Sequence, residues 1–143
     1  MVRMTLALPK QFLFATDIPV RISDINYNNH LGHDSIIELI HEGRVRFLNA
    51  YGFTELDIDG YGLVMTDLAI IYKSEVFYGE ILTIEVSIQD FTKYGCDLIY
   101  RITNKQTGAE VARAKTGILI YDYAKRKVVP VPKSFRSAMV PDS

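Results

Sequence analysis

The sequence predicts an α+β fold in which a long antiparallel β-sheet wraps around one central α-helix. Residues 35–51 repeat apolar side chains every three or four positions, which is the period of an amphipathic helix. The chain after this stretch alternates apolar and polar residues over several long runs, which is the period of strands. Because an extended sheet must bury one face and only one long helix is predicted, we expect the helix to cover the sheet.

A first strand and a polar loop precede the helix. Ile18, Val20 and Ile22 alternate with more polar residues, and Pro19 places this strand at a sheet edge or at its own beginning. The loop that follows is crowded with side chains that form hydrogen bonds: Asp24, Asn26, Asn28, His30, His33 and Asp34. The first N–H groups of a helix are unpaired and carry the positive end of its dipole, so a loop at this place can bind an oxyanion.

The helix is expected to start at a cap formed by Asp34 or Ser35 and to end near Tyr51, with Gly52 as its stop. Its apolar face is predicted to contain Ile36, Ile37, Ile40, Gly43, Phe47 and Leu48. The opposite stripe is polar and contains Glu38, Glu42, Arg46 and Asn49. The two carboxylates of this stripe are expected to face solvent or a subunit contact.

Four long strands are predicted after the helix, in antiparallel succession. They cover residues 63–72, 81–89, 96–103 and 109–122. Asp67 lies inside the first of them and therefore needs a partner. The last strand carries a set of small residues, from Ala112 to Thr116, that would let the helix or a thin ligand approach the sheet closely. A basic turn at 122–127 and a short amphipathic segment at 132–139 complete the chain, and the basic turn is expected to be solvated.

Composition indicates one globular domain, residues 1–143, with 48% hydrophobic residues to form a single core. The net charge of −1 provides no field to hold a nucleic acid. No apolar run approaches the roughly 20 residues that cross a bilayer, and the N-terminal apolar stretch is too short for a signal peptide. We therefore expect a cytoplasmic protein with no membrane partner. The single cysteine, Cys96, is expected to be a core residue.

Open sheet edges are usually covered, commonly by the same edge of a second copy. The predicted sheet has two such edges. The sequence therefore predicts a homo-oligomer, either a homodimer or a homotetramer.

The order of elements and the phrase SDINYNNHLGHD before the helix resemble the hotdog-fold thioesterases over nearly the whole chain. Residues 23–33 are similar to the SDxDxNxHxNN loop of plant acyl-ACP thioesterases and to the SDTDxxGHVNN loop of bacterial acyl-CoA thioesterases related to 4-hydroxybenzoyl-CoA thioesterase. Residues 42–48 resemble the end of the family's central helix, residues 72–82 its Y-x-x-P-x-x-x-G-D-x-L segment, and residues 128–132 its closing segment.

This resemblance implies a hydrolase of fatty acid metabolism that cleaves an acyl-CoA or acyl-ACP to free acid and thiol. CoA or phosphopantetheine would enter only as part of the substrate, and no separate cofactor is implied. His30, His33 and His41 lack the spacing of a zinc motif, so no metal is expected.

The resemblance places Asn26 where these enzymes keep a catalytic Asp, Asn28 at the family's Asn and His30 at its His. An amide cannot deprotonate water, so Asn26 can only orient. His30 is then the expected base, since an imidazole titrates near neutral pH. Asp24, Asp34 and Glu42 are the rival carboxylates, and relatives in this fold that place the acid on the helix draw attention to Glu42.

The expected mechanism places the thioester carbonyl against backbone N–H groups near His33 and Asp34, which stabilise the tetrahedral oxyanion. Asn26 and Asn28 hold the water or the carbonyl, and His30 takes the proton. The pantetheine arm lies between subunits and the acyl chain runs along the helix.

Two other functions remain open. The loop also resembles the D-x-N-P-x-H loop of (R)-specific enoyl-CoA hydratases, with one residue too many and Tyr27 in place of Pro. Alternatively, loss of the family Asp could mark a protein that binds acyl thioesters without cleaving them.

Overall fold

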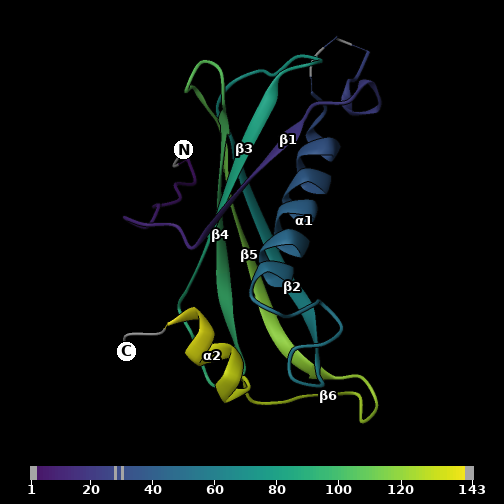
Figure 1. Ribbon diagram of the computed structural model, residues 1–143, viewed down its shortest axis with the longest axis vertical. Helices are drawn as coiled ribbons and strands as arrows, with labels where there is room; N and C mark the ends of the chain where they lie inside the picture. Colours follow the sequence, from purple (N-terminus) through teal and green to yellow (C-terminus); the bar gives the residue numbers. More distant parts are fainter. Residues whose placement is uncertain (1–2, 28, 30, 141–143) are drawn as a thin grey trace.

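The computed structural model describes residues 3–27, 29 and 31–140, and it has the predicted α+β architecture. Its elements are β1 (Phe14–Pro19), the 3₁₀ turn η1 (Ile22–Asp24), α1 (His33–Ala50), β2 (Gly62–Tyr72), β3 (Ile81–Gln89), β4 (Gly95–Asn104), β5 (Glu110–Asp122), β6 (Lys127–Val128) and α2 (Lys133–Met139). Figure 1 shows α1 lying along the twisted sheet, with the short α2 at one end of it. One long helix held against an antiparallel sheet is the hotdog fold.

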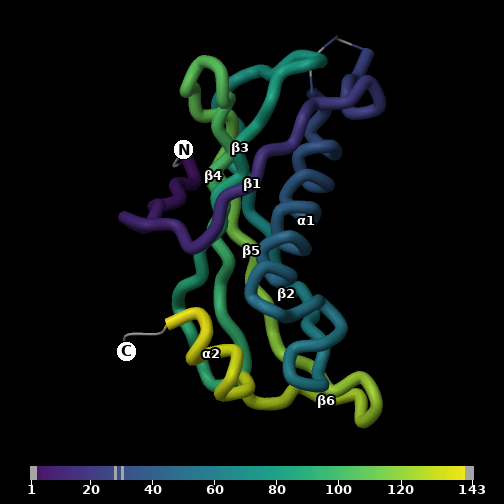
Figure 2. The backbone as a smooth tube through the Cα atoms, viewed as in Figure 1, coloured from purple at the N-terminus to yellow at the C-terminus, as the bar shows by residue number. Residues whose placement is uncertain are grey.

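The sheet is antiparallel throughout and has the order β1-β3-β4-β5-β2, with β6 added beside β5 across the basic turn. The predicted succession is therefore wrong for one pair of strands. β2 and β3 follow each other in the chain, yet β2 forms an edge beside β5 and β3 lies near the opposite edge. Figure 2 shows the connection between them crossing the end of the molecule at which α1 begins. Periodicity identifies strands but does not identify their partners.

β1 lies earlier in the chain than predicted. Ile18 and Val20 are buried, but Ile22 is 71% exposed in the 3₁₀ turn. The buried carboxylate of Asp24 accepts hydrogen bonds from the backbone N–H of Arg21 at 2.8 Å and from its guanidinium at 3.1 and 3.3 Å. This local hydrogen bonding bends the chain and ends the extended conformation, although the alternating pattern continues.

α1 begins at His33, and Gly32 is its N-cap with φ −73° and ψ 153°. The predicted cap is therefore wrong: Asp34 lies in the first turn and Ser35 is buried one residue later. The buried face is also rotated relative to the prediction, since Ile37 is 43% exposed whereas Leu39 is buried. The remaining predicted apolar positions are buried as expected.

The helix packs closely on the sheet. A Cβ added to Gly43 would lie 2.9 Å from Cγ2 of Ile84, so only glycine fits there without a shift. The small residues Ala112, Ala114 and Thr116 of β5 are fully buried. The close approach of the helix at Gly43 is to β3, and the predicted approach at the small residues of β5 stays a prediction.

A buried polar network joins the middle of α1 to the loop after it and to the sheet. Nε of Arg44 donates to Glu55 at 2.7 Å, and its NH1 donates to the hydroxyl of Tyr100 at 3.3 Å. That hydroxyl shares a hydrogen bond of 2.8 Å with Thr116, and Glu55 also bonds His41 at 2.8 Å. The sequence does not predict that Arg44 is buried. Its position in the helical repeat fits the buried face, but its charge favours an exposed position.

The surroundings of Asp67 and Cys96 indicate structural roles for both residues. Asp67 lies at a bulge in β2, forms an ion pair of 3.0 Å with Lys115 and accepts a hydrogen bond from the Gly117 N–H. The hydrogen bond with Lys115 lowers the pKa of Asp67. Burial raises the pKa of the Cys96 thiol to about 12, so the thiol is protonated near neutral pH and has the properties of a core residue.

Within residues 3–27, 29 and 31–140, no helix is both long enough and apolar enough to cross a membrane.

Candidate functional site

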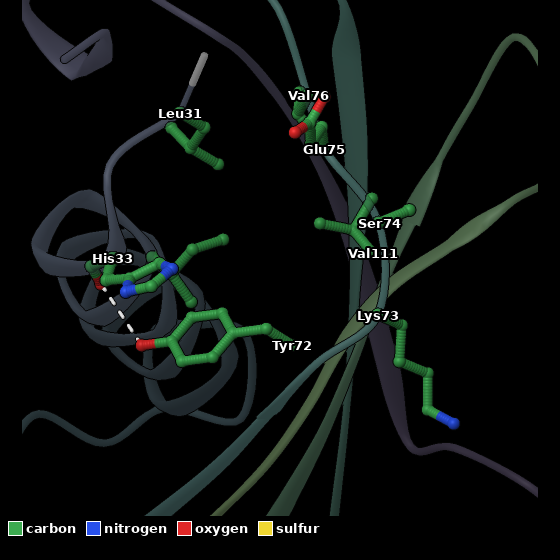
Figure 3. Close-up of a pocket in the computed structure, with 9 residues that line it drawn as sticks. Leu31, His33, Tyr72, Lys73, Ser74, Glu75, Val76 and Val111 are labelled. Carbon is green, nitrogen blue, oxygen red and sulfur yellow. Dashed lines mark hydrogen bonds between the residues drawn. The ribbon is translucent and has the colours of Figure 1, made fainter. Parts of the chain in front are cut away.

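A pocket of about 280 Å³ lies where the start of α1 meets the segment that follows β2 (Figure 3). Its walls combine four apolar side chains, Leu31, Ile36, Val76 and Val111, with five that carry a polar group, His33, Tyr72, Lys73, Ser74 and Glu75. Small-molecule sites usually combine apolar walls with polar groups that fix the orientation of the ligand.

Backbone hydrogen bonds hold the two sides of the pocket together. The N–H of Leu31 donates to the carbonyl of Val76 at 2.7 Å, which joins the loop before α1 to the segment after β2. The same loop closes on itself, since Leu31 pairs with Ile25 and the N–H of Gly32 donates to the carbonyl of Asp24 at 3.1 Å. The start of α1 is therefore held at the pocket wall.

The first turn of α1, which begins at the pocket residue His33, has backbone N–H groups without helical partners. The first helical bond runs from the N–H of Ile36 to the carbonyl of Gly32 at 3.2 Å. The N–H groups of His33 and Asp34 precede it, and they form no hydrogen bond with any other residue whose placement the structure gives. Free N–H groups at the positive end of a helix favour a negative charge on a ligand.

The His33 side chain forms one wall of the pocket. Its ring stacks on that of Tyr72, with centroids 4.2 Å apart and planes 23° apart, and the Tyr72 hydroxyl donates a long hydrogen bond of 3.5 Å to the His33 carbonyl (Figure 3). Burial, together with the charge of Asp34, raises the pKa of Tyr72. The phenol therefore remains protonated and is available as a donor.

Asn26 and Asp34 lie beside the start of the helix. A Cβ added to Gly32 would lie 2.7 Å from Oδ1 of Asp34 and 3.8 Å from Cβ of Asn26. The loop residues Asn28 and His30 lie outside the described residues. The structure therefore brings Asn26, His33 and Asp34 to the same end of α1.

Glu42 lies elsewhere in the protomer. It is on the exposed side of α1, where its carboxylate pairs with Arg46 at 2.9 Å and lines a separate groove of about 390 Å³ beside β1. Asp24, another of the three rival acids, is occupied by Arg21. Within one chain, neither carboxylate contributes to the pocket described above.

No three His, Cys, Asp or Glu side chains are grouped so that they could hold a metal ion, among the residues that the structure describes.

Comparison with known proteins places this architecture in a family. Residues 20–139 match the model of the thioesterase-like superfamily. The chain belongs to the thioesterase-like superfamily. A comparison with curated proteins found no match.

Solved structures share the fold of this superfamily member at low identity. A 1,4-dihydroxy-2-naphthoyl-CoA thioesterase from Synechocystis is 18% identical, with a TM-score of 0.81 over 89% of this chain and 95% of that chain. A DHNA-CoA thioesterase from Staphylococcus aureus is 18% identical, with a TM-score of 0.79 over 89% and 88%. A hypothetical protein from Staphylococcus aureus in complex with CoA is 20% identical, with a TM-score of 0.81 over 96% and 87%.

Sequence reasoning missed the second wall of the pocket in this thioesterase-like protein. The second wall contains Tyr72, Ser74, Glu75 and Val76, about forty positions after the polar loop. These residues meet the loop because β2 runs back to the start of α1. The resemblance of residues 72–82 to a family segment is the available signal in the sequence, but it does not indicate which residues the segment contacts.

Proposed function

We propose that this protein is a thioesterase that hydrolyses an acyl-CoA or acyl-ACP to a free acid and a thiol. The observation that carries the proposal is a pocket that is lined by His33 at the start of α1, where the N–H groups of His33 and Asp34 form no hydrogen bond within the described residues. An acyl group needs apolar walls, and the carbonyl of its thioester needs hydrogen-bond donors where charge develops. Membership of the thioesterase-like superfamily supports this reading of the pocket.

In the proposed reaction the carbonyl oxygen accepts hydrogen bonds from the backbone at His33 and Asp34. Water adds to the carbonyl carbon, and the tetrahedral oxyanion that forms is stabilised by these donors and by the helix dipole. The C–S bond then breaks and the thiol leaves with a proton. Asn26 lies close enough to the helix start to orient the water or the carbonyl.

A base must accept the proton of the attacking water. The hypothesis from the sequence assigns this step to His30, with Asn28 beside it, and both lie outside the described residues. Glu42 would reach a pocket only if it belonged to a neighbouring copy, because its own groove is a different one. The described pocket offers another carboxylate, that of Glu75.

CoA is the better supported carrier. Two of the similar structures are thioesterases of an aromatic acyl-CoA, and a third was solved with CoA. We therefore propose an acyl-CoA substrate before an acyl-ACP one, with the acyl group in the pocket and the pantetheine arm outside it.

Purified protein should release free thiol from at least one member of a panel of aromatic, short-chain and long-chain acyl-CoA esters. The released thiol is measured with a chromogenic disulfide, and acyl-ACP is tested alongside. The Cys96→Ala variant serves as the control that removes the protein's own thiol, and it should retain activity because Cys96 is buried away from the pocket. Binding without release would indicate a binding protein, and hydration of crotonyl-CoA would indicate a hydratase.

We also propose that a second copy of the chain covers the edge strand β2. Met65, Leu68 and Tyr72 of this strand are 48%, 36% and 43% exposed, and Ile37 of α1 is 43% exposed. A long edge strand with exposed apolar side chains readily pairs with its own copy around a two-fold axis. The chain should sediment as a dimer or tetramer at micromolar concentration, and Leu68→Lys should shift it toward the monomer. A monomeric wild-type protein would contradict this proposal.

A further inference from the structure

Among the described residues that line the pocket, Glu75 alone has a carboxylate side chain. We infer that Glu75 is the general base of this site and replaces the carboxylate that the family keeps at the position of Asn26. The inference rests on the proposed thioester hydrolysis and names the residue that activates water in it.

The backbone on both sides of Glu75 is firmly anchored. Ser74 donates its hydroxyl to the carbonyl of Glu110 at 2.8 Å, and the N–H groups of Lys73 and Ser74 point to the carbonyl of Val111 at 2.8 and 3.3 Å. On the other side, Val76 is 1% exposed and accepts the hydrogen bond from Leu31. The backbone that carries Glu75 is therefore fixed at the pocket wall, as the support of a catalytic group must be.

Asp34, in the first turn of α1, does not line the pocket, and the acids near the segment that carries Glu75 are occupied by partners. Asp24 holds Arg21, Glu80 accepts hydrogen bonds from the Phe77 N–H and from Asn104 at 2.7 Å each, and Glu110 holds Arg113 at 2.7 Å. Glu75 forms neither a hydrogen bond nor an ion pair with any residue in the described ranges. Its carboxylate is therefore available to accept a proton from water.

The position of Glu75 suits the reaction. The hydrogen bond from Leu31 to Val76 brings the residue before Val76 next to the loop that leads into α1. Figure 3 shows the Glu75 carboxylate at the rim of the pocket opposite Leu31, whereas the amine of Lys73 points away from the cavity. Glu75 stands where the Y-x-x-P segment that residues 72–82 resemble has proline. Compared with the family, this chain therefore lacks the acid at the position of Asn26 and has an additional acid at Glu75.

Glu75 removes a proton from water while the water oxygen forms a bond to the thioester carbonyl carbon, and the carbonyl electrons move to the oxygen held at His33 and Asp34. The oxyanion then collapses and the C–S bond breaks. The leaving sulfur takes the proton from the Glu75 carboxyl group, which gives the free thiol, the free acid and the regenerated carboxylate.

The inference is tested by steady-state kinetics of Glu75→Gln on the best acyl-CoA substrate. Loss of a general base typically lowers turnover by about 10²- to 10⁴-fold, so kcat should fall by at least about 100-fold with little change in KM. The fall in kcat/KM that wild type shows at low pH, where its base becomes protonated, should be absent from the variant. Glu75→Asp, which keeps the carboxylate, should retain more activity than Glu75→Gln.

Glu38→Gln is the matched control, since it makes the same acid-to-amide change on the exposed side of α1, outside the pocket. Glu38→Gln should have wild-type kcat.

Two results with Glu75→Gln would overturn the inference and leave the proposed function intact. One is a wild-type kcat, and the other is a pH profile of kcat/KM unchanged from wild type. Loss of activity in His30→Ala with full activity in Glu75→Gln would assign the base to His30 instead. Wild-type protein that releases no thiol from any substrate would overturn both the inference and the proposed function.

Discussion

His33→Pro is expected to lower kcat for thioester hydrolysis about 100- to 1000-fold, because it removes one backbone donor to the oxyanion. Proline is accepted at the first position of a helix, where its missing N–H has no helical partner. The preceding residue must be extended, and Gly32 has φ −73° and ψ 153°, which satisfies this requirement. The variant should therefore fold while losing the N–H that the proposed mechanism uses.

His33→Ala is the control that separates the backbone from the side chain. It removes the ring that stacks on Tyr72 but keeps the N–H, so its kcat should fall far less than that of His33→Pro. Both variants are compared with wild type by steady-state kinetics and by thermal unfolding. Equal kcat values in the two folded variants would show that the His33 N–H is not an oxyanion donor.

Arg44→Met is expected to lower the free energy of unfolding by about 3 kcal/mol, because it removes a buried guanidinium and leaves its acceptors without their donor. Arg44 is 6% exposed and Tyr100 is fully buried, so water cannot replace the guanidinium at the Tyr100 hydroxyl, whereas Glu55 is partly exposed. Urea denaturation of the purified variant measures the change.

Arg46→Met provides the matched comparison on the same helix. Arg46 pairs with Glu42 where side-chain exposure is 41% and 50%, and it also donates to the Thr16 hydroxyl and the Asp17 carbonyl. Exposed ion pairs contribute at most about 1 kcal/mol, so the loss should be smaller than that of Arg44→Met. Similar losses in the two variants would contradict the structural role given to Arg44.

The Arg44 network should also make stability depend on pH. Burial raises the pKa of Glu55, but hydrogen bonds and charge from Arg44 and His41 outweigh it and leave the pKa below its usual 4.5. A carboxyl group with a depressed pKa stabilises the folded state above its unfolded value, and this stabilisation is lost as the pH falls through the folded value. Stability of wild type should therefore fall more steeply below about pH 4.5 than that of Arg44→Met.

Much of the fold could be predicted because its main signals are local. The 3.6-residue period located α1 to within a residue or two, and the two-residue period located the strands from β2 to β5. The errors arose where a local interaction overrode the pattern. The hydrogen bonds from Arg21 to Asp24 turn the chain at Ile22. Gly32 is the N-cap of α1 without a side-chain hydrogen bond, so the cap is not the Asp34 or Ser35 that the sequence predicts.

The site could be predicted only in part. The polar loop before the helix was recognised from its residues, and the structure places Asn26, His33 and Asp34 at the helix start. The wall formed by Tyr72 and Glu75 could not be predicted from periodicity, because it depends on β2 pairing with β5 rather than with β3. Likewise, nothing in the helical pattern distinguished the groove around Glu42 from the pocket.

The most direct measurement is a crystal structure with a CoA thioether analogue in which a methylene group separates the sulfur from the carbonyl, so that it cannot be hydrolysed. We expect the analogue's carbonyl oxygen within hydrogen-bond distance of the His33 N–H, about 3 Å, and its acyl group between Leu31, Ile36 and Val76. An analogue bound in the groove beside Glu42, or with its carbonyl directed away from the start of α1, would contradict the proposed site.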